Sequence, residues 1–169
     1  MYPINPDRDQ LVVDKLRDRF GDAILLHETL VDMLCITVRK EPICEILNFL
    51  RNEQELQYNF LTTLCGMHYP QNDQLGVVYH LQSFTNNHRI RIKTVLELAD
   101  PKIPTITSIW PAANWMERET YDFFGIQFEG HPNLKRILNV DEMTVFPLRK
   151  DFPLEDPTRE DKDDSMFGR

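Results

Sequence analysis

Proline is the residue that most constrains this chain, because its distribution along the sequence is uneven. Seven of the 11 prolines follow Asp100, at positions 101, 104, 111, 132, 147, 153 and 157. Proline inside a helix or a central strand removes a backbone donor, so only one further helix of any length fits after Asp100. We therefore expect a sheet domain in residues 1–100, a helix and loop packed on it in 101–138, and an extended arm with an acidic tail in 139–169.

The first hundred residues combine helical and strand patterns. Apolar residues three and four apart predict one helix at Asp7–Phe20, ended by Gly21, and a second helix with Pro42 in its first turn. Runs rich in Ile, Leu, Val and Thr predict five strands, at Ala23–Val31, Met33–Val38, Phe60–Met67, Gly76–Ser83 and Ile90–Leu98. This order indicates an α+β fold, a two-layer α/β domain with a mixed five-stranded sheet and two main helices, followed by a short helix and a Pro-rich extended C-terminal arm.

Composition and charge exclude several classes of protein. The chain has 169 residues, of which 41% are hydrophobic and 27% charged, as in a soluble domain with its own core. Its net charge is −8, which is the wrong sign for binding nucleic acid. A membrane span needs about 20 apolar residues, and no stretch of that length is present.

The N-terminus and the cysteines favour a cytosolic location. The first residues have neither the apolar core of a secretion signal nor the Arg/Ser-rich character of a transit peptide. Cys35, Cys44 and Cys65 are too widely spaced for a C-x-x-C ligand pair, and their odd number does not suit a closed disulfide framework. We expect all three to be buried free thiols.

The short helix after residue 110 concentrates the charged residues of interest. Asn114 is predicted as its N-cap, with Glu117 reaching back as in a capping box, and Gly125 as a left-handed stop. A helical wheel predicts a buried stripe made of Met116, Thr120, Phe123 and Phe124.

The same wheel predicts where three charged side chains of this helix lie. Glu119 flanks the apolar stripe, so we expect its partly buried carboxylate to pair with Arg136 or Lys135. Asp122 and Arg118 are expected on the outer face, four residues apart and able to pair with each other.

A catalytic or metal site is the sharper interpretation of Glu117, Glu119, Asp122 and His131. The spacing argues against it, because Glu117 and Asp122 are about 140° apart on the wheel and no second acidic helix completes a metal shell. Phosphate-loop, nucleophile-elbow and H-E-x-x-H motifs are also absent from the sequence. A structural or interface helix is therefore preferred, with a small metal-dependent hydrolase using Glu119, Asp122 and His131 as an alternative.

The run from Glu117 to Leu138, ERETYDFFGIQFEGHPNLKRIL, resembles the signature of the thirty-kilodalton subunit of respiratory complex I, the proton-translocating NADH:quinone oxidoreductase. Residues 147–154, PLRKDFPL, resemble the extended segment that follows in that family. The chain departs from the family at Lys135, where an arginine is frequent, and loses planar bidentate pairing there. The signature residues implied to be structural or to lie at an interface are Glu117, Arg118, Glu119, Asp122, Gly125, Gly130, His131, Pro132, Leu134, Lys135 and Arg136.

The resemblance implies a non-catalytic scaffold subunit of the peripheral, hydrophilic arm of this enzyme, on the cytoplasmic side of a bacterial membrane. The chain itself would hold no cofactor, while FMN and iron–sulfur clusters would lie in partner subunits that carry electrons from NADH to quinone. Its implied partners are other hydrophilic-arm subunits, especially those with clusters and the quinone site. The equivalent subunit of a related membrane hydrogenase, or of a dehydrogenase with another electron donor, is an alternative.

The last part of the chain is predicted to dock on a partner subunit. Phe146, Leu148 and Phe152 are apolar residues in a segment stiffened by prolines, which loses little conformational entropy on binding. The predicted docking residues are Phe146, Pro147, Leu148, Arg149, Lys150, Asp151, Phe152 and Pro153. The stretch 155–164 has six acids and two bases, and we expect it to be a solvated tail.

Overall fold

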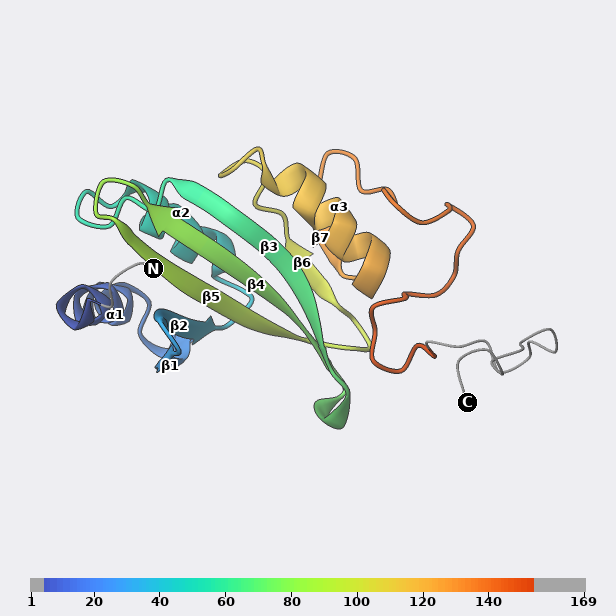
Figure 1. The fold of residues 1–169 in the computed structure, drawn as a ribbon, viewed down its shortest axis with the longest axis horizontal. Coiled ribbons are helices and arrows are strands. Elements are labelled where there is room, and N and C mark those ends of the chain that lie inside the picture. The colour runs from blue at the N-terminus through green and yellow to red at the C-terminus, as the bar shows by residue number, and fades with distance from the viewer. Residues whose placement is uncertain (1–4, 154–169) are drawn as a thin grey trace, which may run out of the picture.

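The computed structural model describes residues 5–153, so the acidic stretch 155–164 lies outside the described residues. Figure 1 shows the order of the elements along the chain. They are α1 (Pro6–Phe20), β1 (Ile24–Leu30), β2 (Met33–Val38), α2 (Ile43–Asn52), β3 (Phe60–Tyr69), β4 (Gln74–Ser83), β5 (His88–Glu97), β6 (Lys102–Pro104), α3 (Ala113–Phe124) and β7 (Gln127–Glu129). Single 3-10 turns at Gly21–Ala23 and Pro70–Asn72 connect α1 to β1 and β3 to β4.

The first two helices form where the sequence predicts them. Asn5 caps α1 by accepting a hydrogen bond from the backbone N–H of Arg8, and Pro6 occupies the first helical position, where a missing N–H costs nothing. In α2, which begins directly after Pro42, the residues spaced three and four apart are buried: Ile43, Ile46, Leu47 and Leu50. Both helices therefore bury one apolar stripe against the sheet.

The five-stranded sheet is mixed, as predicted, with the strand order β1-β2-β5-β4-β3. The pair β2–β5 is parallel and the other three pairs are antiparallel. Parallel neighbours need a crossover connection, and the chain between β2 and β5 supplies it through α2, β3 and β4. The predicted strands agree with the structure to within two residues at each end.

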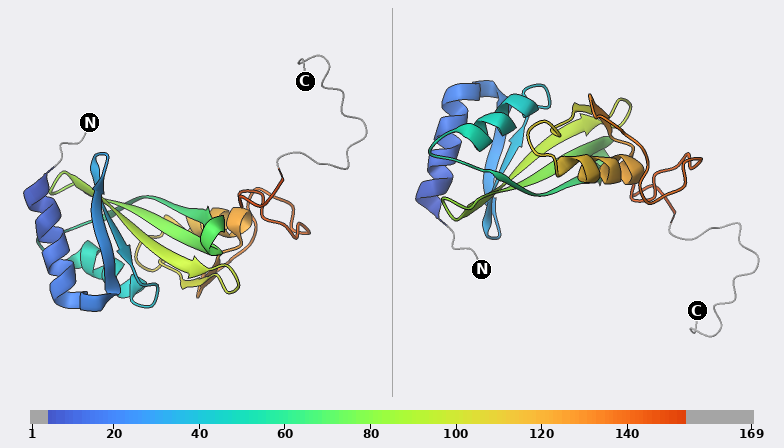
Figure 2. Two further views of the ribbon diagram at one scale, coloured as in Figure 1. Left: turned by 90° about the horizontal axis from the view of Figure 1, so that it is seen from below. Right: turned by 90° about the horizontal axis from the view of Figure 1, so that it is seen from above.

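The core lies between the sheet and the helices. Along β4 the side chains of Leu75, Val77, Tyr79 and Leu81 are fully buried in it. Figures 1 and 2 show α1 and α2 at one end of the sheet and α3 at the other. In β5, buried residues alternate with half-buried ones, which include Arg89, Arg91 and Lys93, so the predicted polar face of this strand is confirmed.

A second, small sheet was not predicted. The strands β6 and β7 have three residues each and pair in parallel, with Ile103 opposite Phe128. Three residues are too few for a strand pattern, and Pro104 argues against a strand in the sequence. This pair holds the segment after β6 close to α3, which matters for Glu117 below.

The two ends of α3 differ in how well the sequence predicts them. The predicted N-cap at Asn114 is wrong, because the helix begins at Ala113 and Ala112 precedes it without a side-chain cap. Gly125 is confirmed as the left-handed stop: its φ is 77° and its N–H donates to the carbonyl of Tyr121 at 2.8 Å. Of the predicted buried stripe only Thr120 is buried, whereas Met116, Phe123 and Phe124 are half-buried, so the stripe is only partly correct.

Two general expectations can also be compared with the structure. The three cysteines are free, but only Cys35 is buried, while Cys44 is half-buried and Cys65 is exposed. The expectation that all three are buried therefore holds only for Cys35. Within residues 5–153, no helix has the length and apolar character needed to cross a membrane.

Candidate functional site

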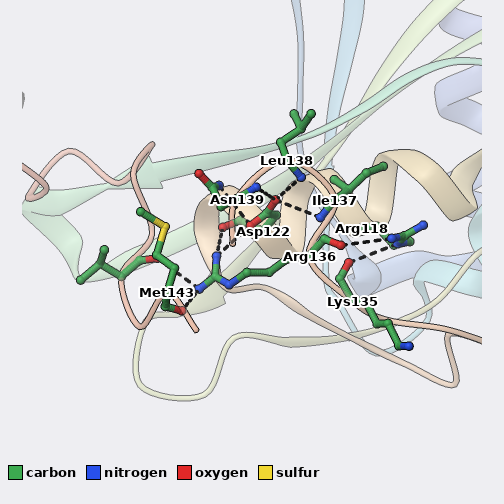
Figure 3. A network of polar contacts seen from close by, with 9 residues as sticks. Arg118, Asp122, Lys135, Arg136, Ile137, Leu138, Asn139 and Met143 are labelled. Atoms are coloured by element: carbon green, nitrogen blue, oxygen red, sulfur yellow. Dashed lines mark hydrogen bonds and ion pairs between the residues drawn. The ribbon is translucent and has the colours of Figure 1, made fainter. Parts of the chain in front are cut away.

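The carboxylate of Asp122, near the end of α3, is the centre of the most extensive polar network in the signature region (Figure 3). Its side chain is fully buried. Oδ2 accepts hydrogen bonds from the backbone N–H groups of Ile137, Leu138 and Asn139, at 3.0, 2.8 and 2.9 Å. Oδ1 accepts from the Asn139 amide at 3.1 Å and from Nη1 of Arg136 at 2.7 Å.

These contacts fix the ionisation state of Asp122. Burial raises the pKa of this carboxyl, but the backbone N–H groups of 137–139 and the Arg136 guanidinium outweigh burial and hold the pKa well below its usual range. Both oxygens of the anion are occupied by donors from the protein itself. Asp122 is therefore suited to hold a loop in place and has no free position for a metal or a substrate.

Arg136 extends the network from α3 to the beginning of the C-terminal arm. Its Nη2 donates to the carbonyl oxygens of Met143 and Val145, and its guanidinium lies 5.2 Å from the centre of the Phe146 ring. Only 7% of its side chain is exposed. We call Asp122, Arg136, the backbone of 137–139 and the carbonyls of Met143 and Val145 the Asp122 network.

Arg118 binds the same loop from the other side and does not pair with Asp122. Its Nε and Nη2 donate to the carbonyl oxygens of Lys135 and Arg136 at 3.2 and 3.1 Å, and it stacks on Trp115. The predicted Arg118–Asp122 pair is therefore wrong. The wheel treated this face as solvent-exposed, whereas the loop 134–139 folds back over it and buries Asp122 under polar backbone.

The predicted pair between Glu119 and Arg136 or Lys135 is also wrong. Glu119 is exposed, so its carboxylate does not need a cation, and Arg136 pairs with Asp122 instead. The error has a simple cause: a helical wheel places residues relative to apolar neighbours, and here burial comes from a polar loop.

The arm packs against the C-terminal end of α3. The backbone N–H of Leu148 donates to the carbonyl of Phe123 at 3.2 Å, and Nε of Arg149 donates to the carbonyl of Phe124 at 2.7 Å. The last carbonyls of a helix have no partner within it and carry its negative dipole end, so a cation is favourable there. Residues 146–149 thus act as a C-terminal cap for α3.

Phe146 is held between two cations and a glycine. Arg149 lies 4.4 Å from the centre of its ring and Arg136 lies on it as well. A Cβ atom built on Gly125 would come within 2.6 Å of the same ring. Two features therefore favour glycine at position 125: its positive φ and the close approach of the Phe146 ring.

The other predicted acid/base residues form a separate group. Glu117 is fully buried and accepts a hydrogen bond from the backbone N–H of Ile106, so the predicted capping box is wrong. Nε2 of His131 lies 3.9 Å from this carboxyl. Among residues 5–153, no group of three or more His, Cys, Asp or Glu side chains could hold a metal ion, and Glu119, Asp122 and His131 do not form one.

The remaining predicted residues lie around these two groups. Gly130 has a φ of 80°, Leu134 packs against the core, and Pro132 and Lys135 are exposed. In the arm, Pro147 and Phe152 are half-buried, whereas Leu148, Lys150, Asp151 and Pro153 are exposed.

Sequence reasoning missed several residues of the site. Asn139, Met143, Thr105 and His68 all contact signature or arm residues, the last through its Nδ1, which accepts the N–H of Lys150 at 2.9 Å. In several of these contacts one partner is a backbone atom, as in the bonds of Met143 and Lys150. Because every residue type has these backbone atoms, the sequence does not indicate which residue provides them.

The comparison with known families decides the identity. Residues 36–158 match the family described as the respiratory-chain NADH dehydrogenase 30 Kd subunit. The chain belongs to this family. A relative from Citrifermentans bemidjiense, named as a subunit of NADH-quinone oxidoreductase, is 47% identical over 149 residues, which cover 88% of this chain and 91% of the relative. The relative of the same name from a Roseiflexus species is 46% identical over 144 residues, which cover 85% of this chain and 83% of the relative.

Solved structures agree with membership of the 30 kDa subunit family. A trypsin-resistant fragment of Nqo5 has a TM-score of 0.61 and 28% identity, covering 75% of this chain and 99% of the fragment. A chain of an archaeal membrane-bound sulfane sulfur reductase has a TM-score of 0.73, covering 87% of this chain and 86% of that chain, and at 24% identity it shows the fold alone. The resemblance inferred from the residues 117–138 is thus confirmed.

Proposed function

We propose that this chain is a non-catalytic subunit of a proton-translocating NADH:quinone oxidoreductase and that its C-terminal arm, residues 139–169, docks on partner subunits. The chain belongs to the 30 kDa subunit family, and its relatives are named as subunits of that enzyme. In this proposal it assists electron transfer by holding partner subunits at fixed positions and takes no part in the chemistry.

One observation carries the docking proposal. Four large apolar side chains of the loop and arm are between 42% and 68% exposed: Leu138, Val140, Val145 and Leu148. We call these four the arm surface. The Asp122 network holds the backbone at Leu138 and Val145, and the Phe123 carbonyl accepts the N–H of Leu148, so these apolar groups lie on fixed backbone and lose little entropy on binding.

The charged residues of the arm have a smaller role in this proposal. Lys150 and Asp151 are exposed, and exposed ion pairs contribute little affinity beyond orientation. Phe146 and Arg149 already contact each other and the end of α3. The apolar arm surface, rather than these two residues, would therefore provide most of the binding free energy.

The proposal places all redox cofactors outside this chain. FMN and the iron–sulfur clusters would be held by partner subunits of the hydrophilic arm, on the cytoplasmic side of the membrane. The names of the relatives favour NADH as electron donor over a hydrogenase or another dehydrogenase. A metal-dependent hydrolase finds no support in the arrangement of Glu119, Asp122 and His131.

Purification of a tagged chain from its own host tests the proposal. Membranes would be solubilised gently, and the material bound through the tag analysed for FMN, iron and NADH:quinone activity. We expect all three to be retained in the assembled material and to be lost when the chain alone is purified after dissociation. Flavin or iron remaining in stoichiometric amount on the isolated chain would contradict the proposal.

A further inference from the structure

The buried carboxyl of Glu117 takes no part in the Asp122 network. It lies on the side of α3 that faces the segment after β6, and no part of its side chain is exposed. Oε1 accepts the backbone N–H of Ile106 at 2.8 Å, and Oε2 lies 2.5 Å from the hydroxyl oxygen of Thr105. A charge at this position is costly unless a cation or several donors compensate it.

His131 lies beside Glu117, but its hydrogen bonds go to other groups. Its side chain is fully buried, and its Nδ1 accepts the backbone N–H of Asn133 at 3.0 Å. Its Nε2 lies 3.1 Å from the carbonyl oxygen of Asn114, so that nitrogen carries the proton. Both ring nitrogens therefore have partners other than Glu117, and the 3.9 Å between Nε2 and the Glu117 carboxyl is too long for a hydrogen bond.

The other titratable groups around Glu117 carry no positive charge. From α2, Cys44 lies close by and its thiol donates to the carbonyl of Thr105 at 3.5 Å. From β4, Tyr79 is fully buried, and among the described residues its hydroxyl has no hydrogen-bond partner. Desolvation by burial is the main cause that raises the pKa of both groups above their ordinary values, so both remain neutral.

The hydroxyl hydrogens can be counted for both forms of Glu117. Thr105 has one hydroxyl proton and two neighbours that could accept it, Glu117 at 2.5 Å and the Thr107 hydroxyl at 3.1 Å. If Glu117 is ionised, the Thr105 hydroxyl donates its proton to the carboxylate. The hydrogen bond between the two threonine hydroxyls must then be donated by Thr107. If Glu117 is neutral, its O–H donates to the Thr105 hydroxyl oxygen, which also accepts the backbone N–H of Thr107 at 3.2 Å, and Thr105 donates its own proton to the Thr107 hydroxyl. The surrounding groups can therefore accept the proton of a neutral carboxyl.

We propose that Glu117 is a buried proton-binding site of this domain, neutral when α3 is seated on the Thr105–Thr107 segment, and that loss of its proton weakens this contact. Burial raises the pKa of Glu117 to about 7, and the hydrogen bonds from Thr105 and Ile106 lower it only in part. The geometry supports this independently, since the carboxyl is fully buried and its hydrogen-bond partners, the Thr105 hydroxyl and the Ile106 N–H, carry no charge.

The sign of the pH dependence follows from the higher pKa in the folded chain. An ordinary glutamate has a pKa of 4.5, so between about pH 4.5 and 7 the folded chain keeps a proton that the unfolded chain releases. The contribution of Glu117 to stability is therefore full below about pH 4.5 and is lost as the pH rises through about 7. For one proton the unfolding constant changes by about tenfold per pH unit in this range.

Urea unfolding of the full chain and of Glu117→Gln between pH 5 and 8 tests the proposal. The amide keeps the shape of a neutral carboxyl but cannot ionise. The unfolding constant of the unchanged chain divided by that of Glu117→Gln should therefore rise by about tenfold per pH unit from pH 5 to 7 and then level off. Glu119→Gln, an exposed neighbour on the same helix, should give a ratio that does not change with pH. A ratio for Glu117→Gln that is equally flat would overturn the proposal.

Infrared spectroscopy gives a readout that does not depend on the variant being stable. The full chain labelled with ¹³C at the glutamate carboxyl carbons should show the stretch of a neutral carboxylic acid at pH 6, decreasing with a midpoint near pH 7. Glu119→Gln should keep this band. A labelled chain without a neutral-carboxyl band at pH 6 would show that Glu117 is ionised and would reject the proposal.

Discussion

Arg136 donates a 2.7 Å hydrogen bond to Asp122 from a position 14 residues further along the chain, and both side chains are almost fully buried. The pair joins the end of α3 to the loop that follows β7. Through Met143 and Val145 it also reaches the arm. This ion pair therefore helps to fix the backbone that carries the arm surface.

Asp122→Asn should destabilise the domain by about 3 to 5 kcal/mol, because it leaves the Arg136 guanidinium buried without an anion. Urea unfolding of the full chain measures this free energy. Asp141→Asn, an exposed aspartate in the same loop region, should change stability by less than about 0.5 kcal/mol. If Asp122→Asn and Arg136→Met were simply additive in a double-mutant cycle, the pair would contribute nothing and the account of the network would fail.

The stability due to Asp122 should also depend on pH in one direction. Its pKa is lowered in the folded chain, so its contribution is fully present above the ordinary value of 3.8 and is lost as the pH falls below it. The difference in unfolding free energy between the wild type and Asp122→Asn should be constant from pH 5 to 8 and become smaller below pH 3.8. If this difference in unfolding free energy already decreased between pH 7 and 5, Asp122 would not be an ionised carboxylate whose two oxygens both accept hydrogen bonds.

Gly125→Ala and Gly130→Ala form a matched pair of substitutions. Both positions have a φ near 80°, so each alanine should lower the free energy of unfolding by about 1 kcal/mol because of the left-handed conformation. A Cβ at Gly130 would lie 3.5 Å from Thr105, an ordinary contact, whereas at Gly125 it would lie 2.6 Å from the Phe146 ring. Gly125→Ala should therefore cost more in thermal unfolding than Gly130→Ala, and Phe146→Ala should reduce the excess. Equal costs would show that Phe146 does not pack on Gly125.

Glu119→Ala should change the free energy of unfolding by less than about 0.5 kcal/mol, because the side chain is exposed. The sequence alone predicted a shielded pair with Arg136 or Lys135, and breaking such a pair would cost about 3 to 5 kcal/mol. Urea unfolding thus distinguishes the two assignments of the partner of Arg136. A large loss at Glu119 together with a small loss at Asp122 would favour the sequence-based assignment.

The sheet domain could be predicted because its elements depend on local patterns. The strand Met33–Val38 and the buried face of α2 follow directly from apolar periodicity. The stop at Gly125 follows from backbone sterics that act on one residue. These features need no knowledge of distant parts of the chain.

The contacts of α3 could not be predicted in the same way. Asp122 is buried by a loop whose N–H groups point at it, and a backbone N–H is the same in every residue type except proline. Glu117 is buried because β6 and β7 bring Thr105 and Ile106 under the helix, and strands of three residues leave no periodic signal. The signature residues were recognised by resemblance, while their partners are a property of the tertiary fold.

Substitutions in the arm surface test the central claim, that this chain holds an enzyme complex together through the arm. Leu148→Asp and Val140→Asp place charges on side chains that are 52% and 67% exposed, so the isolated chain should remain folded by circular dichroism. Val31→Asn is the control, since Val31 is 94% exposed, lies in the β1–β2 turn and has a φ of 60°, which asparagine tolerates.

Native electrophoresis of membranes from cells carrying each variant as the only copy, with NADH:quinone activity measured on the same membranes, is the most direct measurement. The account predicts a full-size, active complex with Val31→Asn and loss of the assembled complex and its activity with the two arm variants. A full-size complex with normal activity in Leu148→Asp and Val140→Asp, both folded, would contradict it.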